Sequence, residues 1–533
     1  MRLFHILRKE LLVLALLLSV SHGFAKCVIV TSPGEPALGN GDVLFKLLTS
    51  QTKCPANVFA LHTLLTAKGY DIKKSLVSNR GFHSRSDSFS LFEWVIGSGP
   101  AGVSQPGDFF LGHFTASDEQ TLIADQNTDQ ESLMIELELK DPSKNGAYNF
   151  YELRGTGEGS QWFYRGDSFD IYADLKLLHR NAPDEEIFGS RLRCSGCHLS
   201  GGPILKELAA PHNDWWTKLR PIDLTGWTFE KALGEMLSLN ADDASKRLPS
   251  AVSDAEELAQ LVTASSNQLI HSPQINAKRT TSLTLAERLR PLFCPMELNL
   301  ESSSRPVDDG GDIDIPSGFF VDPRLATASV SMPRQAYLDA LTQLGSQFPE
   351  SNPVRPDGDH AWVTPVKSHY DQEAVTELVQ QGLISNHFVR AVLAVDFTNP
   401  VFSNARCQLL RLVPSETADW QSQFRLALAK SSSPSGAQLA AGLSQPGDQS
   451  QAKAKAFSEA CKARYLKADE AKALVTLLFQ RRAEAFASDI SKNELGQILE
   501  PSFRVIFPKI EQVPNLARPL SLDPDSCAVV GGE

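Results

Sequence analysis

Residues 133–153 read LMIELELKDPSKNGAYNFYEL. Within this stretch Ile135, Leu137 and Leu139 alternate with acidic side chains, which is the period of a strand that buries one face. Residues 142–146 supply turn-forming side chains, and the run 147–153 again favours a strand. The stretch therefore predicts two antiparallel strands joined by a short turn.

Further strands are predicted on both sides of this hairpin. Aromatic and β-branched residues are enriched in short runs that are separated by Gly and Asp. These runs are 88–96, 108–115, 161–165 and 169–175. We therefore expect residues 26–178 to form an antiparallel, β-rich N-terminal domain.

The pattern changes to helical spacing after about residue 180, with apolar side chains three and four positions apart. Helices are predicted over 204–210, 228–239, 255–264 and 283–292, and then over 335–344, 372–382, 387–395, 419–430 and 468–487. We expect a mainly α-helical domain over 179–300 and a mainly helical C-terminal domain over 301–533. Residues 431–452 are rich in Ser, Gly, Pro and Gln, which predicts a mobile loop. The fold class expected from the whole chain is α+β.

The most specific chemical motif is Cys194-Ser195-Gly196-Cys197-His198. Two thiols at this spacing can each form a thioether with a vinyl group of haem, and the histidine that follows can ligate the iron. A Cys-x-x-Cys pair also occurs in zinc sites and in thiol redox enzymes. A structural zinc site needs a second pair, but the next cysteine, Cys294, stands alone, and a redox pair has no use for the histidine. The motif therefore predicts one covalent haem c.

Over residues 193–203 the chain resembles the c-type cytochromes, on the strength of this motif. The resemblance implies a mono-haem protein in which Cys194 and Cys197 hold the haem, His198 is the proximal iron ligand, and the iron has a redox role. It also implies that the helical domain of residues 179–300 is cytochrome c-like. A looser similarity, based on the strands that precede the motif, is to cytochrome P460-like proteins.

The sixth iron ligand decides what such a haem does, because Met or a second His closes the iron for electron transfer, whereas an open position permits chemistry on small molecules. Three candidates follow the motif: Met236, His212 and Met296. Met236 also fits the core stripe of a helix, and His212 also fits a helix start. More distant candidates are His179, His113 and His83, which could reach the iron only if the sheet domain covers the haem.

Residues 1–25 are typical of a secretory signal peptide, since basic residues precede an apolar run of about ten residues and small residues follow it. Covalent haem attachment takes place outside the bacterial cytoplasm, so we expect an exported, periplasmic protein with no transmembrane span after cleavage. The chain has eight cysteines, and six lie outside the motif. In an oxidising compartment these six favour disulfides, with Cys27–Cys54 as the local pair.

The net charge is −12, from 51 basic and 63 acidic residues. This balance argues against binding to a nucleic-acid backbone and suits a basic redox partner. The sequence therefore predicts one-electron transfer with a partner protein. The alternative is a haem c enzyme of the peroxidase or oxidase type, or a small-ligand sensor, with an open distal iron site. In addition, the acidic, Gly-containing run 308–314 is either a calcium loop or a solvated turn.

Overall fold

The computed structural model describes the following residues: 26–31, 34–79, 88–115, 133–156, 159–172, 198, 200–204, 255–294, 298–301, 311–315, 317–327, 330–336, 339, 364–367, 369–445, 449–491 and 521–530. The predicted signal peptide, residues 1–25, lies outside them. The helices predicted over 204–210, 228–239 and 335–344 lie wholly or largely outside them as well.

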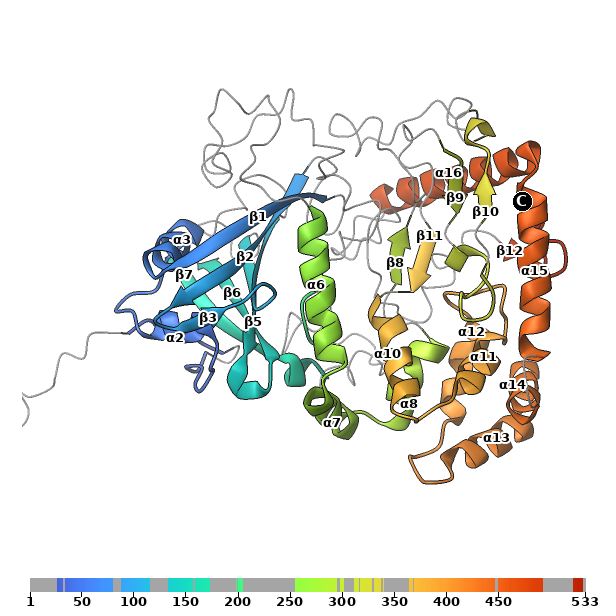
Figure 1. Cartoon of the computed structure of the whole chain (residues 1–533), viewed down its shortest axis with the longest axis horizontal. Coiled ribbons are helices and arrows are strands. Elements are labelled where there is room, and N and C mark those ends of the chain that lie inside the picture. The colour runs from blue at the N-terminus through green and yellow to red at the C-terminus, as the bar shows by residue number, and fades with distance from the viewer. Residues whose placement is uncertain are drawn as a thin grey trace, which may run out of the picture.

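Seven antiparallel strands form one sheet in the N-terminal part of the described chain (Figure 1). Their order across the sheet is β1-β2-β4-β5-β6-β7, and β3 pairs with the end of β2. The strands are β1 (Tyr70–Asn79), β2 (Ser88–Gly99), β3 (Gly102–Ser104), β4 (Phe109–Thr115), β5 (Leu133–Asp141), β6 (Ala147–Thr156) and β7 (Gly159–Asp167). The expected antiparallel, β-rich N-terminal region is confirmed, and β1 is a strand that the sequence pattern had not indicated.

The hairpin predicted over residues 133–153 is formed by β5 and β6. The turn between them begins with the 3₁₀ segment η2 (Pro142–Lys144), which the side chain of Asp141 caps by accepting from the backbone N–H of Ser143. Asn145 then adopts a left-handed conformation with φ of 58°. Asn tolerates this conformation better than most residues, so the turn follows from its sequence.

The two faces of the sheet pack against different elements. On one face, Leu137 and Tyr151 belong to the hydrophobic core that includes α2 (Val43–Thr49) and α3 (Val58–Ala67). Side chains alternate along a strand, so Phe150 points to the opposite face. There it packs in a second cluster together with Leu269 and Ile270 of α6 (Ala255–Ile270), the long helix that stands beside the sheet in Figure 1.

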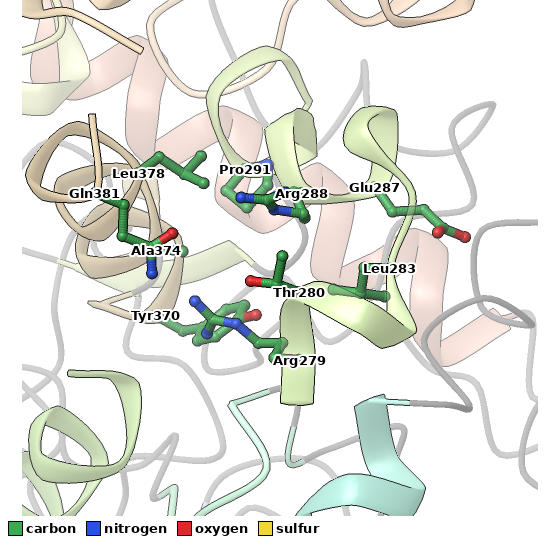
Figure 2. A pocket seen from close by; sticks show the side chains of 10 residues that line it. All are labelled: Arg279, Thr280, Leu283, Glu287, Arg288, Pro291, Tyr370, Ala374, Leu378 and Gln381. Carbon is green, nitrogen blue, oxygen red and sulfur yellow. The ribbon is translucent and has the colours of Figure 1, made fainter. Parts of the chain in front are cut away.

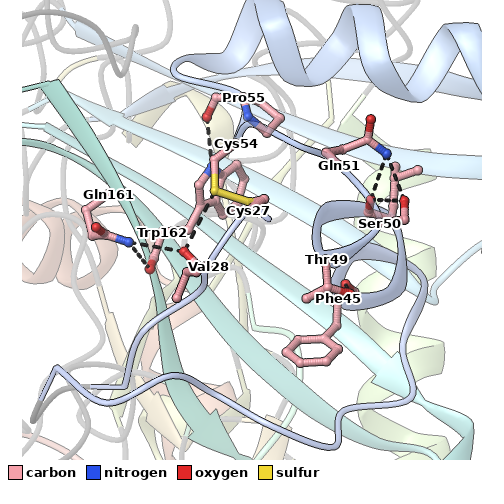
Figure 3. The surroundings of a disulfide bond; sticks show 11 residues. Cys27, Val28, Phe45, Thr49, Ser50, Gln51, Cys54, Pro55, Gln161 and Trp162 are labelled. Carbon is pink, nitrogen blue, oxygen red and sulfur yellow. Dashed lines mark hydrogen bonds between the residues drawn. A yellow bond between two sulfur atoms is a disulfide. The ribbon is translucent and has the colours of Figure 1, made fainter. Parts of the chain in front are cut away.

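A disulfide between Cys27 and Cys54 joins the first described residues to the segment between α2 and α3 (Figure 3). Beside it, the indole Nε1 of Trp162 in β7 donates to the carbonyl of Pro55 at 2.8 Å. The disulfide and this hydrogen bond together hold the segment between α2 and α3 against β7, at the edge of the sheet. The disulfide also confirms the pair Cys27–Cys54 that was expected from the sequence.

The remainder of the described chain is mainly helical. The helices after α6 are α7 (Pro273–Ser282), α8 (Leu285–Phe293), α10 (His369–Gln380), α11 (Asn386–Leu393), α12 (Asn404–Cys407), α13 (Trp420–Lys430), α14 (Pro434–Ser444), α15 (Gln449–Tyr465) and α16 (Ala468–Ser491). Helix α8 begins at a complete capping box of Thr284 and Glu287, as its sequence favours. Aromatic rings of Phe293, Phe388 and Phe424 meet in the core of this region. The chain therefore has an α+β fold with a helical C-terminal region.

Short strand pairs and two more disulfides brace the helical region. The pairs are β8 (Leu298–Glu301) with β11 (Thr364–Lys367), β9 (Ile313–Ile315) with β10 (Val330–Met332), and β12 (Ser521–Leu522) with β13 (Val529–Val530). The disulfides are Cys294–Cys407 and Cys461–Cys527. All six cysteines outside the Cys-x-x-Cys-His motif are thus paired.

Two local predictions are wrong. Residues 169–175 were expected to form a strand, but residues 168–172 are helical, because Asp167 accepts hydrogen bonds from the backbone N–H groups of Phe169 and Asp170 and so caps a helical turn. Residues 431–452 were expected to form a mobile loop, but α14 and the start of α15 occupy most of this range. Ser433 caps α14, and Leu439 buries its apolar face, which outweighs the Ser- and Gly-rich composition.

None of the helices in the described part of the chain is long and apolar enough to cross a membrane.

Candidate functional site

The described end of the Cys-x-x-Cys-His motif is His198, and residues 200–204 after it are also described. These residues form a turn in which the backbone N–H of Gly201 donates to the carbonyl of His198 at 2.8 Å. The turn lies against the sheet face that carries Phe150, against the helical residues 168–172 and against α6. His198 therefore sits where the sheet meets the helical region.

The imidazole of His198 is buried, with 5 % of the residue exposed. Its ring lies 5.1 Å from the ring of Phe150, centroid to centroid. Its Nδ1 is 3.0 Å from the carbonyl oxygen of Gly202 and 3.4 Å from Oε1 of Glu138. A carbonyl oxygen only accepts hydrogen bonds, so Nδ1 carries a proton, and in the neutral imidazole Nε2 is then the nitrogen with the lone pair. This is the tautomer that a histidine needs in order to bind a metal through Nε2.

Glu138 reaches His198 because of its position in β5. It pairs in register with Phe150 of β6, so both side chains point to the same face of the sheet. Burial raises the pKa of the Glu138 carboxyl well above its ordinary value, and the neighbouring charge of Glu136 raises it further. Among the described residues, Oε2 of Glu138 has no hydrogen-bond partner. The sheet therefore contributes an acidic group to the surroundings of His198.

Hydrogen bonds to backbone carbonyls hold the turn after His198 in place. The hydroxyl of Ser168 donates to the carbonyl of Gly201 at 2.6 Å, and the hydroxyl of Tyr172 donates to the carbonyl of Ser200 at 2.8 Å. Burial raises the pKa of Tyr172, which keeps this phenol protonated and able to donate. The short helix of residues 168–172 thus acts as a clamp on the turn.

Two glycines are required by this close packing. Gly201 has a φ of +76°, and a Cβ built on it would lie 2.8 Å from ring atoms of Tyr172. A Cβ on Gly202 would lie 2.7 Å from the side chain of Leu269 in α6. From the same helix, Ser266 donates a hydrogen bond to the carbonyl of Pro203. The Gly-Gly-Pro sequence after the motif therefore lets the turn lie directly on α6 and Tyr172.

Most other candidate residues lie outside the described part of the chain. This holds for the two motif cysteines, Cys194 and Cys197, and for all three candidates for the sixth ligand, Met236, His212 and Met296. His179 and His83 are also outside it, and His113 lies in β4 with no side-chain description. Residues 308–310 of the acidic run are not described, and residues 313–315 form β9. The part of the chain that the structure describes contains no group of three or more His, Cys, Asp or Glu side chains arranged to hold a metal ion.

The contacts of His198 are of the kind found at metal-ligating histidines. A metal-ligating histidine typically donates its other ring N–H to a carbonyl or a carboxylate, and His198 has both within reach. Sequence reasoning found His198 but missed its partners Glu138 and Phe150, which lie about 50 to 60 residues upstream. The sequence signal that could have pointed to Glu138 is the alternation of acidic and apolar residues over 133–139, because it places acidic side chains on one face of a strand.

Comparisons of the chain with protein-family models, with curated proteins and with solved structures found no match. The functional interpretation rests on the motif and on the geometry around His198.

Proposed function

We propose that the chain is an exported, mono-haem c-type cytochrome that transfers single electrons. In this proposal Cys194 and Cys197 hold the haem through thioethers, and His198 ligates the iron through Nε2. The bound haem supplies an iron that cycles between two oxidation states. The observation that carries the proposal is the Cys-x-x-Cys-His spacing combined with the buried His198, whose Nδ1 donates to the carbonyl of Gly202.

The residues around His198 have separate roles in this proposal. The carbonyl of Gly202 accepts from Nδ1 and fixes the orientation of the imidazole ring, and Oε1 of Glu138 lies 3.4 Å from the same nitrogen. Phe150 covers one side of the ring and keeps water away from it. Ser168 and Tyr172 hold the turn, so the ring does not move when the charge on the iron changes. The distal ligand in the proposal is one of Met236, His212 and Met296.

Compartment and charge support the same proposal. Three disulfides are compatible with an oxidising compartment, in which haem c is attached. The net charge of −12 suits association with a basic redox partner.

One observation favours a second candidate, a haem c enzyme or small-ligand sensor. An ionised carboxylate near Nδ1 raises the basicity of a ligating imidazole, and Glu138 Oε1 is 3.4 Å from Nδ1 of His198. Because burial raises the pKa of Glu138, this candidate requires the bound haem to favour the ionised form of Glu138. A more basic proximal ligand donates more electron density to the iron, which assists chemistry on bound oxygen species. This candidate requires an open distal position.

The visible spectrum of the reduced protein, recorded before and after addition of carbon monoxide, distinguishes the two candidates. We expect no change, because a strong internal sixth ligand excludes carbon monoxide. Prompt formation of a carbon monoxide adduct would overturn the electron-transfer proposal in favour of the enzyme or sensor.

The role of His198 is tested with His198→Ala and the matched control His369→Ala, an exposed histidine at the start of α10. We expect the first variant to keep covalent haem and to lose its normal iron spectrum, and the control to keep both. An unchanged spectrum in His198→Ala would exclude His198 as the ligand.

A further inference from the structure

The end of α6 meets α10 at the boundary between the sheet and the helical region (Figure 1). Leu269 of α6 packs in one hydrophobic cluster with Tyr370 and Ala374 of α10. Figure 2 shows the same two side chains of α10, which line one small hollow together with Arg279 of α7. Apolar packing therefore brings α10 against the end of α6.

His271, the residue that follows α6, faces two carboxylates of α10. Its Nδ1 is 2.7 Å from Oε2 of Glu377, and its Nε2 is 3.1 Å from Oε2 of Glu373. An ionised carboxylate accepts hydrogen bonds and does not donate them, so each ring nitrogen needs a proton to form its bond. The neutral imidazole carries one such proton and the imidazolium carries two. The charged form of His271 is therefore the form that makes both contacts.

The two glutamates differ in what else holds them. Oε1 of Glu377 accepts from Asn276 of α7 at 2.8 Å and from Gln381 at 2.9 Å. Within the described residues, the side chain of Glu373 has His271 as its one hydrogen-bond partner, and this side chain is 26 % exposed. Loss of one proton from the imidazolium therefore releases Glu373 to water, while Glu377 stays attached to α7.

The surroundings of His271 favour its charged form. Burial lowers the pKa of His271, but hydrogen bonds to Glu377 and Glu373, together with their charges, outweigh burial and raise the pKa above its ordinary value. The end of a helix also favours a cation. Both contacts are therefore present below about pH 6.5, and the second is lost as the pH rises through the raised pKa.

The other titratable groups at this contact respond differently. Nε2 of His369 in α10 is 2.6 Å from the amide oxygen of Asn267, so this histidine meets a neutral acceptor. Carboxylates, lysines and arginines generally keep their charge between about pH 6 and pH 9. The remaining charged side chains on the packed elements are of these types: Lys140 of β5, Lys278 and Arg279 of α7, and Asp371 of α10.

We propose that His271 is a pH-sensitive latch between α6 and α10. At low pH the imidazolium ties both Glu373 and Glu377 to the end of α6. At higher pH the neutral ring releases Glu373, and local separation of α10 from α6 becomes more frequent. The latch follows from these contacts alone and does not depend on the proposed haem.

The latch acts on the part of α6 that supports the turn after His198. Ser266 donates to the carbonyl of Pro203, and Leu269 lies against Gly202. These two residues precede His271 by five and two positions. Release of the latch therefore also loosens the support of this turn.

Hydrogen exchange read by mass spectrometry, on the full-length exported protein, tests the proposal. Protection is measured at about pH 6 and about pH 8.5 and corrected for the intrinsic rate at each pH. We expect the protection of peptides covering residues 262–272 and 369–381 to fall about threefold to tenfold at the higher pH, as for the loss of one partly exposed charged contact. Peptides covering α13 and α14 should keep their protection.

Three variants assign the effect to named residues. His271→Gln should show the lower protection at both pH values, because Gln does not titrate. Glu373→Gln should lose most of the pH response, because it removes the carboxylate that requires the second proton. The matched control is His369→Gln, which removes a histidine from the same contact and should keep the response of the native protein.

The proposal is overturned if protection at α6 and α10 is equal at the two pH values. It is also overturned if His271→Gln keeps the native response, or if His369→Gln abolishes that response. A loss of protection that extends equally to α13 and α14 would mean that His271 changes the stability of the whole protein and does not act as a local latch.

Discussion

Replacement of Gly201 by alanine should disrupt the turn after His198, and the structure contains a matched control for it. Gly201 and Gly382 have similar left-handed conformations, with φ of +76° and +72°. A Cβ on Gly382 would meet nothing within 4 Å, whereas a Cβ on Gly201 would lie 2.8 Å from the ring of Tyr172. The two substitutions therefore share the backbone cost and differ in the contact with Tyr172.

The expected magnitudes follow from this difference. An alanine in the left-handed region costs about 1–2 kcal/mol, and the loss of unfolded-state entropy returns up to about 1 kcal/mol, so Gly382→Ala should destabilise by about 1 kcal/mol. Gly201→Ala additionally displaces the buried ring of Tyr172, at about 1–3 kcal/mol for overpacking. It also breaks the hydrogen bond from Tyr172 to Ser200, at about 1 kcal/mol. Gly201→Ala should therefore cost about 2–4 kcal/mol more than Gly382→Ala.

The assay is unfolding of both variants by urea, together with the visible spectrum of the reduced protein. Gly201→Ala should also alter the spectrum, because a displaced turn moves the carbonyl of Gly202 away from Nδ1 of His198. Gly382→Ala should leave the spectrum unchanged. Equal destabilisation by the two variants would refute the conclusion that Tyr172 holds the turn in close contact.

Two further predictions concern stability away from the haem motif. Replacing both Cys294 and Cys407 by alanine opens a loop with a sequence separation of 113 and should lower the free energy of unfolding by about 4–5 kcal/mol, as measured by urea unfolding. A loss below about 1 kcal/mol would show that this bond does not constrain the unfolded chain. Burial lowers the pKa of His271, but hydrogen bonds and charges from Glu377 and Glu373 outweigh burial and raise the pKa above its ordinary value. The stabilisation from this histidine is therefore complete below about pH 6.5 and is lost as the pH rises through the raised pKa. His271→Gln should be less stable than the native protein at about pH 5.5 and should approach its stability near about pH 9. A constant difference in stability across this range would contradict the raised pKa of His271.

The sequence predicted the parts of the fold that depend on local patterns. The alternation in residues 133–139 and the turn residues 142–146 correctly identified the β5–β6 hairpin. The spacing of Cys27 and Cys54 correctly suggested a pair. Both features join residues that lie close together along the chain, so they can be predicted without knowledge of the tertiary structure.

The features that the sequence missed depend on local capping or on long-range packing. The strand predicted for 169–175 was wrong because the side chain of Asp167 caps a helix, and capping outweighed a run of residues that favour strands. The pairing of Cys294 with Cys407 joins residues far apart in sequence, and six cysteines allow fifteen pairings. The contact of Glu138 with His198 likewise depends on how the turn docks on the sheet, which no local pattern specifies.

The covalent haem is the central claim, and intact-mass spectrometry of the exported, denatured protein tests it most directly. The protein should be produced in a bacterium that attaches haem to a control c-type cytochrome. We expect a mass increase of one haem, and loss of that increase when Cys194 and Cys197 are both replaced by alanine. An unmodified mass for the native chain, or retained haem in the double variant, would contradict the assignment of this chain as a c-type cytochrome.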